Sequence, residues 1–275
     1  MKSKKAINSH VILPKSILEK FSYVDEKGNH IIKYINLNTL KIEEDKTSRF
    51  NTQLGYYSRE NEKILSDNAE SKIGNVIKKI QEIKEDTVFN ESDIKSIYKF
   101  LAYQVIRTDF FSEKLKEKFN ISIENKLIKN IMINDELKLN TVYKVVEDSD
   151  IHILINNTKI KFVLPANTMY TFNANSEEYI WIQILSPDIA ISFMPRGTIK
   201  KLSNSADNNK FKILNFYEEN TDIINNFNLR ALGVQYKDKT QYRYVIGLDK
   251  ELKQLINIIK KKGVKYVKFW IFKEK

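Results

Sequence analysis

The sequence predicts an α+β fold, in which an N-terminal helical layer is followed by a mainly antiparallel, strand-rich half with two later helices. Two observations carry this prediction. Apolar residues recur at helical spacing over residues 59–83 and 93–119. After Leu139 the pattern changes to short apolar runs, separated by the Asn-, Asp- and Pro-containing turns that are typical of strand connections. Because helices are grouped before strands instead of alternating with them, the pattern indicates α+β.

The chain is expected to form a single α+β domain over residues 1–275, with a helical subregion at 59–135 and a strand-rich subregion at 140–275. At 275 residues, 42% of them hydrophobic, it is long enough and apolar enough to bury a substantial core. The sequence contains no internal repeat and no low-complexity domain.

The chain begins with two short elements before the first long helix. Residues 14–21 are expected to form a short helix, and residues 29–36 alternate like a strand after the turn signal Glu26-Lys27-Gly28. A polar loop follows. The apolar residues that predict a helix over 59–83 are Leu65, Ala69, Ile73, Val76, Ile77, Ile80 and Ile83.

A second long helix is predicted over residues 93–119, with Asn90 or Ser92 as its candidate N-cap. Each of these polar residues is followed directly by an acidic residue, which suits the positive end of a helix dipole. A third helix is expected at residues 123–133.

The second half is predicted to consist mainly of short strands. These strands are expected at 142–147, 151–156, 160–164, 169–173, 180–185 and 189–194. The remaining segments are expected to be a polar linker at 203–209, a helix near 221–233, a strand at 242–246, a helix at 250–262 and a last strand at 264–272.

Composition limits the cellular setting and the chemistry. The chain has no cysteine, which excludes disulfides, thiolate metal sites and cysteine nucleophiles, and fits a reducing compartment. The basic start Met1-Lys2-Ser3-Lys4-Lys5 is followed by polar residues, so no signal-peptide core is expected. No window approaches the roughly 18–20 apolar residues of a membrane helix. We therefore expect a cytoplasmic protein that does not bind a membrane.

The formal net charge of +11 makes nucleic acid a candidate partner through phosphate neutralisation. A compositional explanation competes with this, because lysine, asparagine and isoleucine are abundant throughout the chain, as in proteins from AT-rich genomes. We favour the compositional explanation by about two to one, since net charge bears on solubility and non-specific binding before it bears on function. The densest basic run, residues 260–262, ends a predicted helix, where the helix dipole favours cations.

Arg107 is the most informative residue of the sequence. It falls on the apolar face of the 93–119 helix, beside Phe100, Tyr103, Gln104 and Phe111. A guanidinium on such a face needs bidentate carboxylate or carbonyl partners. The sequence therefore predicts a buried polar centre around Arg107.

Glu62 and Glu70 are the candidate partners of Arg107. Glu62 projects in nearly the same direction as Ala69, Ile73 and the rest of the apolar stripe of its helix, because separations of seven and eleven residues return close to the same face. Glu70 lies about a quarter turn away, at the edge of the stripe, where a carboxylate can reach a neighbouring helix.

His10 is the third candidate, in the context Asn8-Ser9-His10-Val11. A neutral imidazole can act as a general base or a metal ligand. His10, Glu62 and Glu70 together would suit a hard divalent cation such as Mg²⁺ or Mn²⁺. The competing interpretation is that His10 is a local hydrogen-bonding residue.

A purely structural interpretation of the centre stays open. An Arg107–Glu62 or Arg107–Glu70 pair would fix the register of two helices, and such pairs often carry no chemistry. The sequence has no phosphate-cradling Gly-rich loop, no His-Glu-x-x-His motif and no Gly-x-Ser-x-Gly elbow. Trp181 and Trp270 lie in strand-like runs, which favours core positions over a binding surface.

The order of these motifs resembles a bacterial family of unknown function, number 4238, over about the first 115 residues well and over the remainder weakly. The motifs that carry the resemblance are His10-x-x-x-Pro14-x-x-x-Leu18-x-x-Phe21, Tyr56-Tyr57, Glu62, Glu70-Ser71 and the run from Phe100 to Thr108. Where that family has a Ser-Asp-Asn-Pro turn, this chain has Pro165-Ala166-Asn167-Thr168, so the family aspartate is replaced by Ala166.

The resemblance implies that His10, Glu62, Glu70, Gln104 and Arg107 form one polar site. The leading hypothesis is a metal-assisted hydrolase acting on nucleic acid or nucleotide phosphate. In it Glu62 and Glu70 bind a divalent ion or position water, His10 moves a proton and Arg107 stabilises phosphate charge.

Two other hypotheses remain open. One is a non-catalytic binding or interaction module, in which Arg107 with Glu62 or Glu70 is a structural core ion pair and the strand-rich half binds a protein or nucleic acid. The other is a host-defence or toxin-like role. An open cleft where the carboxylates meet His10 would favour the enzyme, and a dry, sealed Arg107 pair would favour the module.

Overall fold

The computed structural model describes residues 8–82, 89–167, 169–175, 178–195, 211–237 and 243–269. The chain divides into two compact units. The first, here called the helical unit, comprises Met1–Ser16 and Ser48–Glu147, and the second, the sheet unit, comprises Ile17–Thr47 and Asp148–Lys275. Helices and strands are both abundant, as the α+β class requires. None of the helices in the described segments is long and apolar enough to span a membrane.

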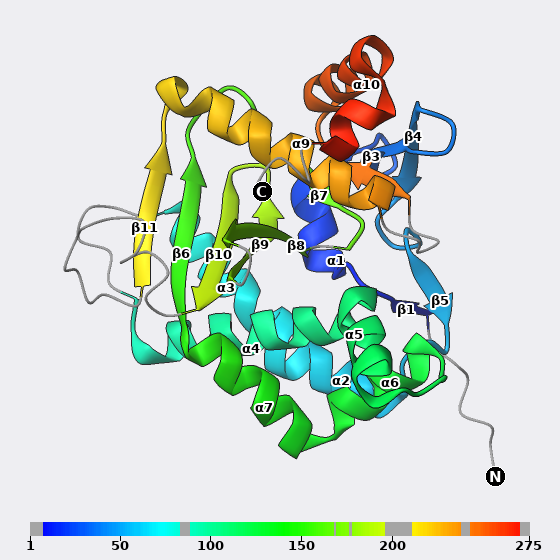
Figure 1. Ribbon diagram of the computed structural model, residues 1–275, viewed down its shortest axis with the longest axis vertical. Helices are drawn as coiled ribbons and strands as arrows, with labels where there is room; N and C mark the ends of the chain where they lie inside the picture. Colours follow the sequence, from blue (N-terminus) through cyan, green and yellow to red (C-terminus); the bar gives the residue numbers. More distant parts are fainter. Residues whose placement is uncertain are drawn as a thin grey trace. The chain divides into compact units, whose positions relative to one another are not determined.

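The helical unit contains a small two-stranded sheet and a group of helices (Figure 1). Strand β1 (Asn8–His10) pairs antiparallel with β5 (Thr52–Leu54). The helices are α2 (Arg59–Leu65), the π-helical turn η2 (Ser66–Glu70), α3 (Ser71–Gln81), α4 (Glu91–Arg107), α5 (Asp109–Phe119), α6 (Asn125–Asn134) and α7 (Glu136–Glu147). Helix α4 packs against α3, α5, α6 and α7, so it is the centre of this unit.

The predicted helix over 59–83 is present as α2, η2 and α3, which follow one another without a break from Arg59 to Gln81. Six of its seven predicted apolar positions are buried, and the seventh, Ile83, lies outside the described residues. Periodicity did not predict the π-helical turn, in which the backbone N–H of Ser71 bonds the carbonyl of Ser66.

The prediction of one helix over 93–119 is wrong at Thr108, where the chain forms two helices. Thr108 has an extended backbone (ψ 144°), and its hydroxyl accepts a hydrogen bond from the N–H of Phe111, so it caps α5. The same hydroxyl donates to the carbonyl of Val105 at 2.7 Å and closes α4. Asn90, one of the two predicted N-caps, is the N-cap of α4 and forms a reciprocal capping box with Asp93.

The predicted strand at 142–147 is also wrong, because these residues belong to helix α7. Val142 and Val146 are buried four residues apart, which is helical spacing. Burial of this side of α7 against α4 outweighs the β propensity of the valines. The predicted third helix is confirmed as α6.

The sheet unit contains two sheets. Its first segment runs through α1 (Lys15–Leu18), which crosses the boundary between the units, η1 (Glu19–Phe21), β2 (Ser22–Val24), β3 (His30–Asn36) and β4 (Lys41–Lys46). One sheet has the order β2-β3-β12-β7, with β4 paired to β3. It includes β7 (Leu164–Pro165) and β12 (Tyr244–Ile246). The predicted polar loop after residue 36 therefore contains strands β4 and β5.

The second sheet has the order β11-β6-β10-β9-β8 and is antiparallel except for the parallel β11–β6 pair. Its strands are β6 (Ser149–Asn156), β8 (Met169–Asn175), β9 (Glu178–Ser186), β10 (Ile189–Pro195) and β11 (Phe211–Phe216). Helices α9 (Thr221–Lys237) and α10 (Asp249–Phe269) follow, with the short η3 (Glu218–Asn220) before α9. The predicted strands at 151–156, 169–173, 180–185 and 189–194 and both late helices are confirmed.

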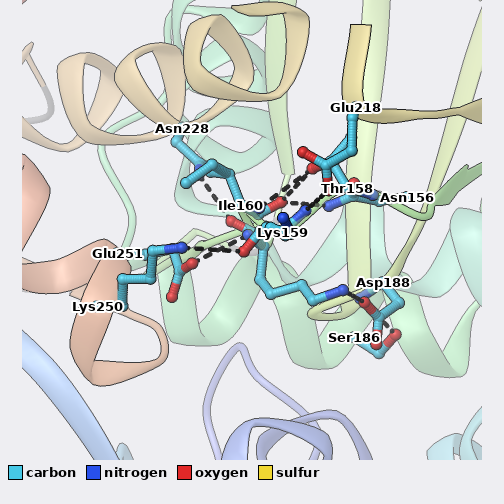
Figure 2. A network of polar contacts seen from close by, with 11 residues as sticks. Asn156, Thr158, Lys159, Ile160, Ser186, Asp188, Glu218, Asn228, Lys250 and Glu251 are labelled. Atoms are coloured by element: carbon cyan, nitrogen blue, oxygen red, sulfur yellow. Dashed lines mark hydrogen bonds and ion pairs between the residues drawn. The ribbon is translucent and has the colours of Figure 1, made fainter. Parts of the chain in front are cut away.

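Of the predicted strand at 160–164, only Leu164 lies in a strand, β7. The backbone groups of the preceding residues form hydrogen bonds with side chains instead (Figure 2). The N–H of Lys159 donates to Oε1 of Glu218 at 2.8 Å, and the N–H of Lys161 donates to Oε1 of Glu251 at 3.1 Å. Asn228 accepts from the N–H of Val163 and donates to the carbonyl of Lys161. Side-chain partners from η3, α9 and α10 thus replace strand pairing in this segment.

The predicted strand at 264–272 is wrong as far as Phe269, because α10 extends to that residue. Gly263 interrupts this helix with a left-handed φ of 77°, a conformation that glycine adopts without strain. Residues 270–275 and the predicted linker at 203–209 lie outside the described residues.

Candidate functional site

Arg107, at the last turn of α4, is the centre of the polar site in the helical unit. Its side chain is only 1% exposed. Nη1 donates to Oε1 of Glu70 at 2.6 Å, and Nη2 donates to the backbone carbonyl of His10 at 2.6 Å. The ring of Tyr57 lies 5.8 Å from the guanidinium carbon. Both terminal nitrogens of this cation are therefore used by protein groups.

Electrostatics keeps Arg107 charged in its buried position. Burial alone would lower the pKa of Arg107, but the charges of Glu70 and Glu62 and the hydrogen bond to Glu70 outweigh that effect and raise it. Glu70 lies in the π-helical turn, and its side chain is 27% exposed. Glu70, and not Glu62, is thus the direct ion-pair partner.

The segment around β1 is held to the helices by several hydrogen bonds besides that of Arg107. The hydroxyl of Tyr57 donates to the carbonyl of Val11 at 2.7 Å, and the ring of Tyr57 is almost fully buried. The N–H of Tyr57 donates to the hydroxyl of Ser9 at 3.4 Å. Ser9 also hydrogen-bonds the carboxylate of Glu62. Three consecutive residues, Ser9 to Val11, are therefore hydrogen-bonded to Glu62, Arg107 and Tyr57.

His10 contributes its backbone carbonyl to this clamp, while its imidazole has a separate environment. Burial, and next the charge of Arg107, lower the pKa of His10 from 6.5 to about 4, so the ring is neutral at pH 7. The ring hydrogen-bonds the backbone of Phe50, whereas its Nδ1 is buried without a hydrogen-bond partner among the described residues.

Glu62 is the second carboxylate of the centre. Burial raises its pKa, Ser9 and Arg107 oppose that rise, and the charge of Glu70 adds to it. Its Oε1 is buried and has no hydrogen-bond partner in the described part of the chain. The centre thus holds a neutral imidazole and a carboxylate with a raised pKa, and the charges of Arg107 and Glu70 act on both groups.

The hypothesis of a metal cluster formed by His10, Glu62 and Glu70 finds no support. In the described segments no group of three or more His, Asp or Glu side chains is arranged to hold a metal ion. The physical reason is the position of Arg107, because a guanidinium 2.6 Å from Oε1 of Glu70 repels a divalent cation from that carboxylate.

Gln104 lies one turn before Arg107 on α4 and is fully buried. The five predicted residues therefore all belong to the helical unit, and the contacts described above join Arg107, Glu70, Glu62 and the backbone of His10. Phe111 belongs to α5 and Arg107 to α4, so the prediction that they share one helical face is wrong.

Sequence reasoning missed two features of this region. The first is the role of Tyr57, because the motif Tyr56-Tyr57 does not indicate that the hydroxyl of Tyr57 binds the carbonyl of Val11. The second feature is a buried ion pair in which Nζ of Lys129 donates to Oδ1 of Asp109 at 2.6 Å, with Lys129 fully buried. Nothing in the sequence distinguishes Lys129 from Lys126, the other lysine of α6.

The remaining candidates lie elsewhere. Trp181 is half-buried in β9 and stacks on Phe193 with ring centroids 5.9 Å apart, while Trp270 lies outside the described residues. His30 and His152 occupy strands β3 and β6, as expected. Neither tryptophan is therefore described as an exposed binding residue, whereas Tyr23 in β2 is 44% exposed.

A family model described as "Protein of unknown function (DUF4238)" matches residues 8–195, which is well over half of the chain. The match includes the whole Arg107 centre and every residue of its clamp. It also continues through strands β6 to β10. No curated protein and no solved structure matches the chain.

Proposed function

Since the chain belongs to the DUF4238 family of proteins of unknown function, and the family match contains the whole Arg107 centre, we propose that it is a non-catalytic binding module. In this proposal Arg107 and Glu70 form a structural ion pair that holds the N-terminal segment on the helical unit. One observation carries the proposal. The two terminal guanidinium nitrogens of Arg107 donate hydrogen bonds to Glu70 and to the His10 carbonyl, and the Arg107 side chain is 1% exposed. A cation buried to that degree has no solvent-facing side for a phosphate, although its Nε is buried without a hydrogen-bond partner among the described residues.

Among the described residues, no other group of the centre supplies the positive charge that hydrolysis of a phosphate ester requires. Stabilising such a transition state needs donors or metal ions aimed at developing negative charge. The described carboxylates and His10 form no metal-binding group. The groups around Arg107 instead bind the backbone of residues 9–11, which is the pattern of an anchor.

The test is the stability of Arg107→Met, which keeps an unbranched side chain but removes the charge. Removing one partner of a buried pair costs about 3–5 kcal/mol, so the free energy of unfolding should fall by that amount in urea titrations followed by circular dichroism. Arg59→Met, at an exposed arginine of the same unit, is the matched control and should change stability by less than about 0.5 kcal/mol. Equal stability of the two variants would refute the structural role of Arg107.

A hydrolase is the second candidate, because one observation favours it. The unpartnered Nδ1 of His10 and Oε1 of Glu62 are both buried in the Arg107 centre, which therefore holds a neutral imidazole and a carboxylate of raised pKa, two kinds of group that general acid–base catalysis uses. Its substrates would be nucleic acid or nucleotide phosphate, with Mg²⁺ or Mn²⁺ supplied in the assay.

His10→Ala separates the two candidates, because Arg107 binds the carbonyl of residue 10 and not its side chain. The variant should keep the clamp and fold like the parent. The binding module predicts that neither protein cleaves bis(p-nitrophenyl) phosphate, a single-stranded oligonucleotide or ATP with either metal. Cleavage by the parent that is lost in folded His10→Ala and Glu62→Gln would establish the hydrolase and overturn the binding module.

A further inference from the structure

A pocket of about 280 Å³ lies within the helical unit, lined by residues of α2, η2, α4, α6 and α7. None of its lining residues belongs to the Arg107 clamp. Ile64, Ala102 and Leu139 give it an apolar part, and Tyr103 and Tyr143 contribute aromatic rings. Pockets for small molecules have volumes of roughly 300–1,000 Å³. This pocket is therefore suited to a molecule of the size of an amino acid and is too small for a dinucleotide.

Two side chains of opposite charge line this pocket. Lys99 comes from α4 and Glu136 from the first position of α7, and both are exposed. Within the described segments neither forms an ion pair with the other or with any further residue. Opposite charges that face one pocket without pairing suit a ligand that itself carries both charges.

The buried side of the pocket is held in place by Tyr103, which is 3% exposed. Its hydroxyl hydrogen-bonds the side chain of Asn68. Burial, together with the charge of Glu136, raises the pKa of Tyr103, so the hydroxyl stays protonated. Tyr143 is half-buried and packs edge-on against Tyr98, with centroids 6.2 Å apart. The rings are thus fixed, while the two charged side chains are free to close on a ligand.

Asn68 belongs to the π-helical turn, which supplies the second observation. Single π-helical turns are rare and occur often at functional sites. This turn presents Asn68 to the pocket and Glu70 to Arg107. A regular helix would direct these two side chains differently.

We propose that this pocket binds an α-amino acid with an apolar side chain, whose carboxylate is held by Lys99 and whose ammonium group is held by Glu136. The apolar side chain of the ligand lies against Tyr103, Tyr143 and Ile64. The proposal rests on the proposed function, since it names the ligand of the binding module, but it involves none of the clamp residues.

The experiment measures binding of L-phenylalanine and L-leucine to the full chain by isothermal titration calorimetry and saturation-transfer NMR. Phenethylamine, which lacks the carboxylate, and 3-phenylpropionate, which lacks the ammonium group, are the matched ligands. At least one of the two amino acids should bind. If L-phenylalanine binds, its affinity should be at least tenfold higher than that of either analogue. Lys99→Gln and Glu136→Gln should each weaken binding at least tenfold. Lys95→Gln, at an exposed lysine one turn away that pairs with Glu91, should bind like the parent.

Three results would overturn the proposal. They are no binding of either amino acid at millimolar concentration, equal binding of L-phenylalanine and its two analogues, and unchanged binding by both Lys99→Gln and Glu136→Gln. Failure of the proposed function shows in different measurements. One is phosphate-ester cleavage that depends on His10, and the other is an Arg107→Met variant that is as stable as its control. The two failures are therefore distinguishable.

Discussion

The guanidinium of Arg107 binds the backbone carbonyl of His10 and not its side chain, so substitutions of His10 leave this hydrogen bond in place. Position 10 supplies the carbonyl whatever its side chain, so imidazole chemistry and clamp stability are separable at one residue. Glu70 is different, because its own carboxylate carries the ion pair. Individual substitutions can therefore assign separate roles to side chains that lie in one cluster.

Stability should depend on pH through His10. The folded chain takes up the His10 proton only near pH 4, whereas the unfolded chain takes it up near the ordinary pKa of 6.5. The free energy of unfolding is therefore complete above about pH 6.5 and falls as the pH drops toward 4, by at most about 3 kcal/mol. Urea titrations between pH 7 and pH 4 measure this slope.

The controls for this prediction are His10→Ala and His30→Ala. The slope between pH 6.5 and 4 should be reduced in His10→Ala and retained in His30→Ala, whose ring is exposed. Glu62 has a raised pKa and acts in the opposite direction, but it is present in all three proteins, so it does not affect the comparison. An identical slope in parent and His10→Ala would disprove the lowered pKa.

At the scale of elements, the break at Thr108 is the feature with the clearest local cause. Its hydroxyl accepts the N–H of Phe111 and so satisfies one of the free donors of α5. Thr108→Ala should lower the free energy of unfolding by about 1 kcal/mol, in the range of lost N-caps, while Thr108→Ser should stay near the parent. Chemical denaturation of the three proteins measures the difference, and an unchanged Thr108→Ala would show that the cap contributes nothing.

Periodicity predicted the elements whose burial pattern is regular. The helix containing Leu65, Ala69 and Ile73 buries one apolar face, and the strands at 151–156, 180–185 and 189–194 are runs buried on both faces. Periodicity did not predict helix α7. Val142 and Val146 suit a strand as well as a helix, and only packing against α4 decides between the two. The 160–163 segment was mispredicted because its backbone partners, such as Glu218 and Glu251, are distant in sequence.

The candidate site could be predicted only in part. A charge on an apolar helical face identified Arg107, and helical spacing brought Glu70 within reach of it. The binding of Arg107 to a backbone carbonyl left no mark in the sequence, since every residue has a carbonyl. The pocket near Lys99 and Glu136 was missed because its lining comes from four helices and the turn between two of them, each with an ordinary polar pattern.

At the scale of the whole molecule, the net charge of +11 predicts only weak association with nucleic acid. Many lysines of the helical unit pair with acidic residues, for example Lys79 with Asp93, Lys114 with Glu117 and Lys116 with Glu113. We expect non-specific dissociation constants of roughly 10⁻⁴–10⁻⁶ M that weaken steeply between 50 and 200 mM salt. Fluorescence anisotropy with two unrelated duplexes measures this, and tight, sequence-dependent binding at 200 mM salt would contradict it.

The π-helical turn at Ser66–Glu70 amounts to one residue inserted into an otherwise α-helical stretch. Each residue of an α-helix advances the chain by about 100° around the axis. Deleting Ala69 would therefore rotate the residues before it, Asn68 included, by about 100° relative to Glu70 and the residues after it. If Glu70 kept its place on Arg107, Asn68 could no longer point at Tyr103. A single insertion is thus what allows one continuous stretch of chain to serve two neighbouring sites, and its removal would force the protein to give up one of them.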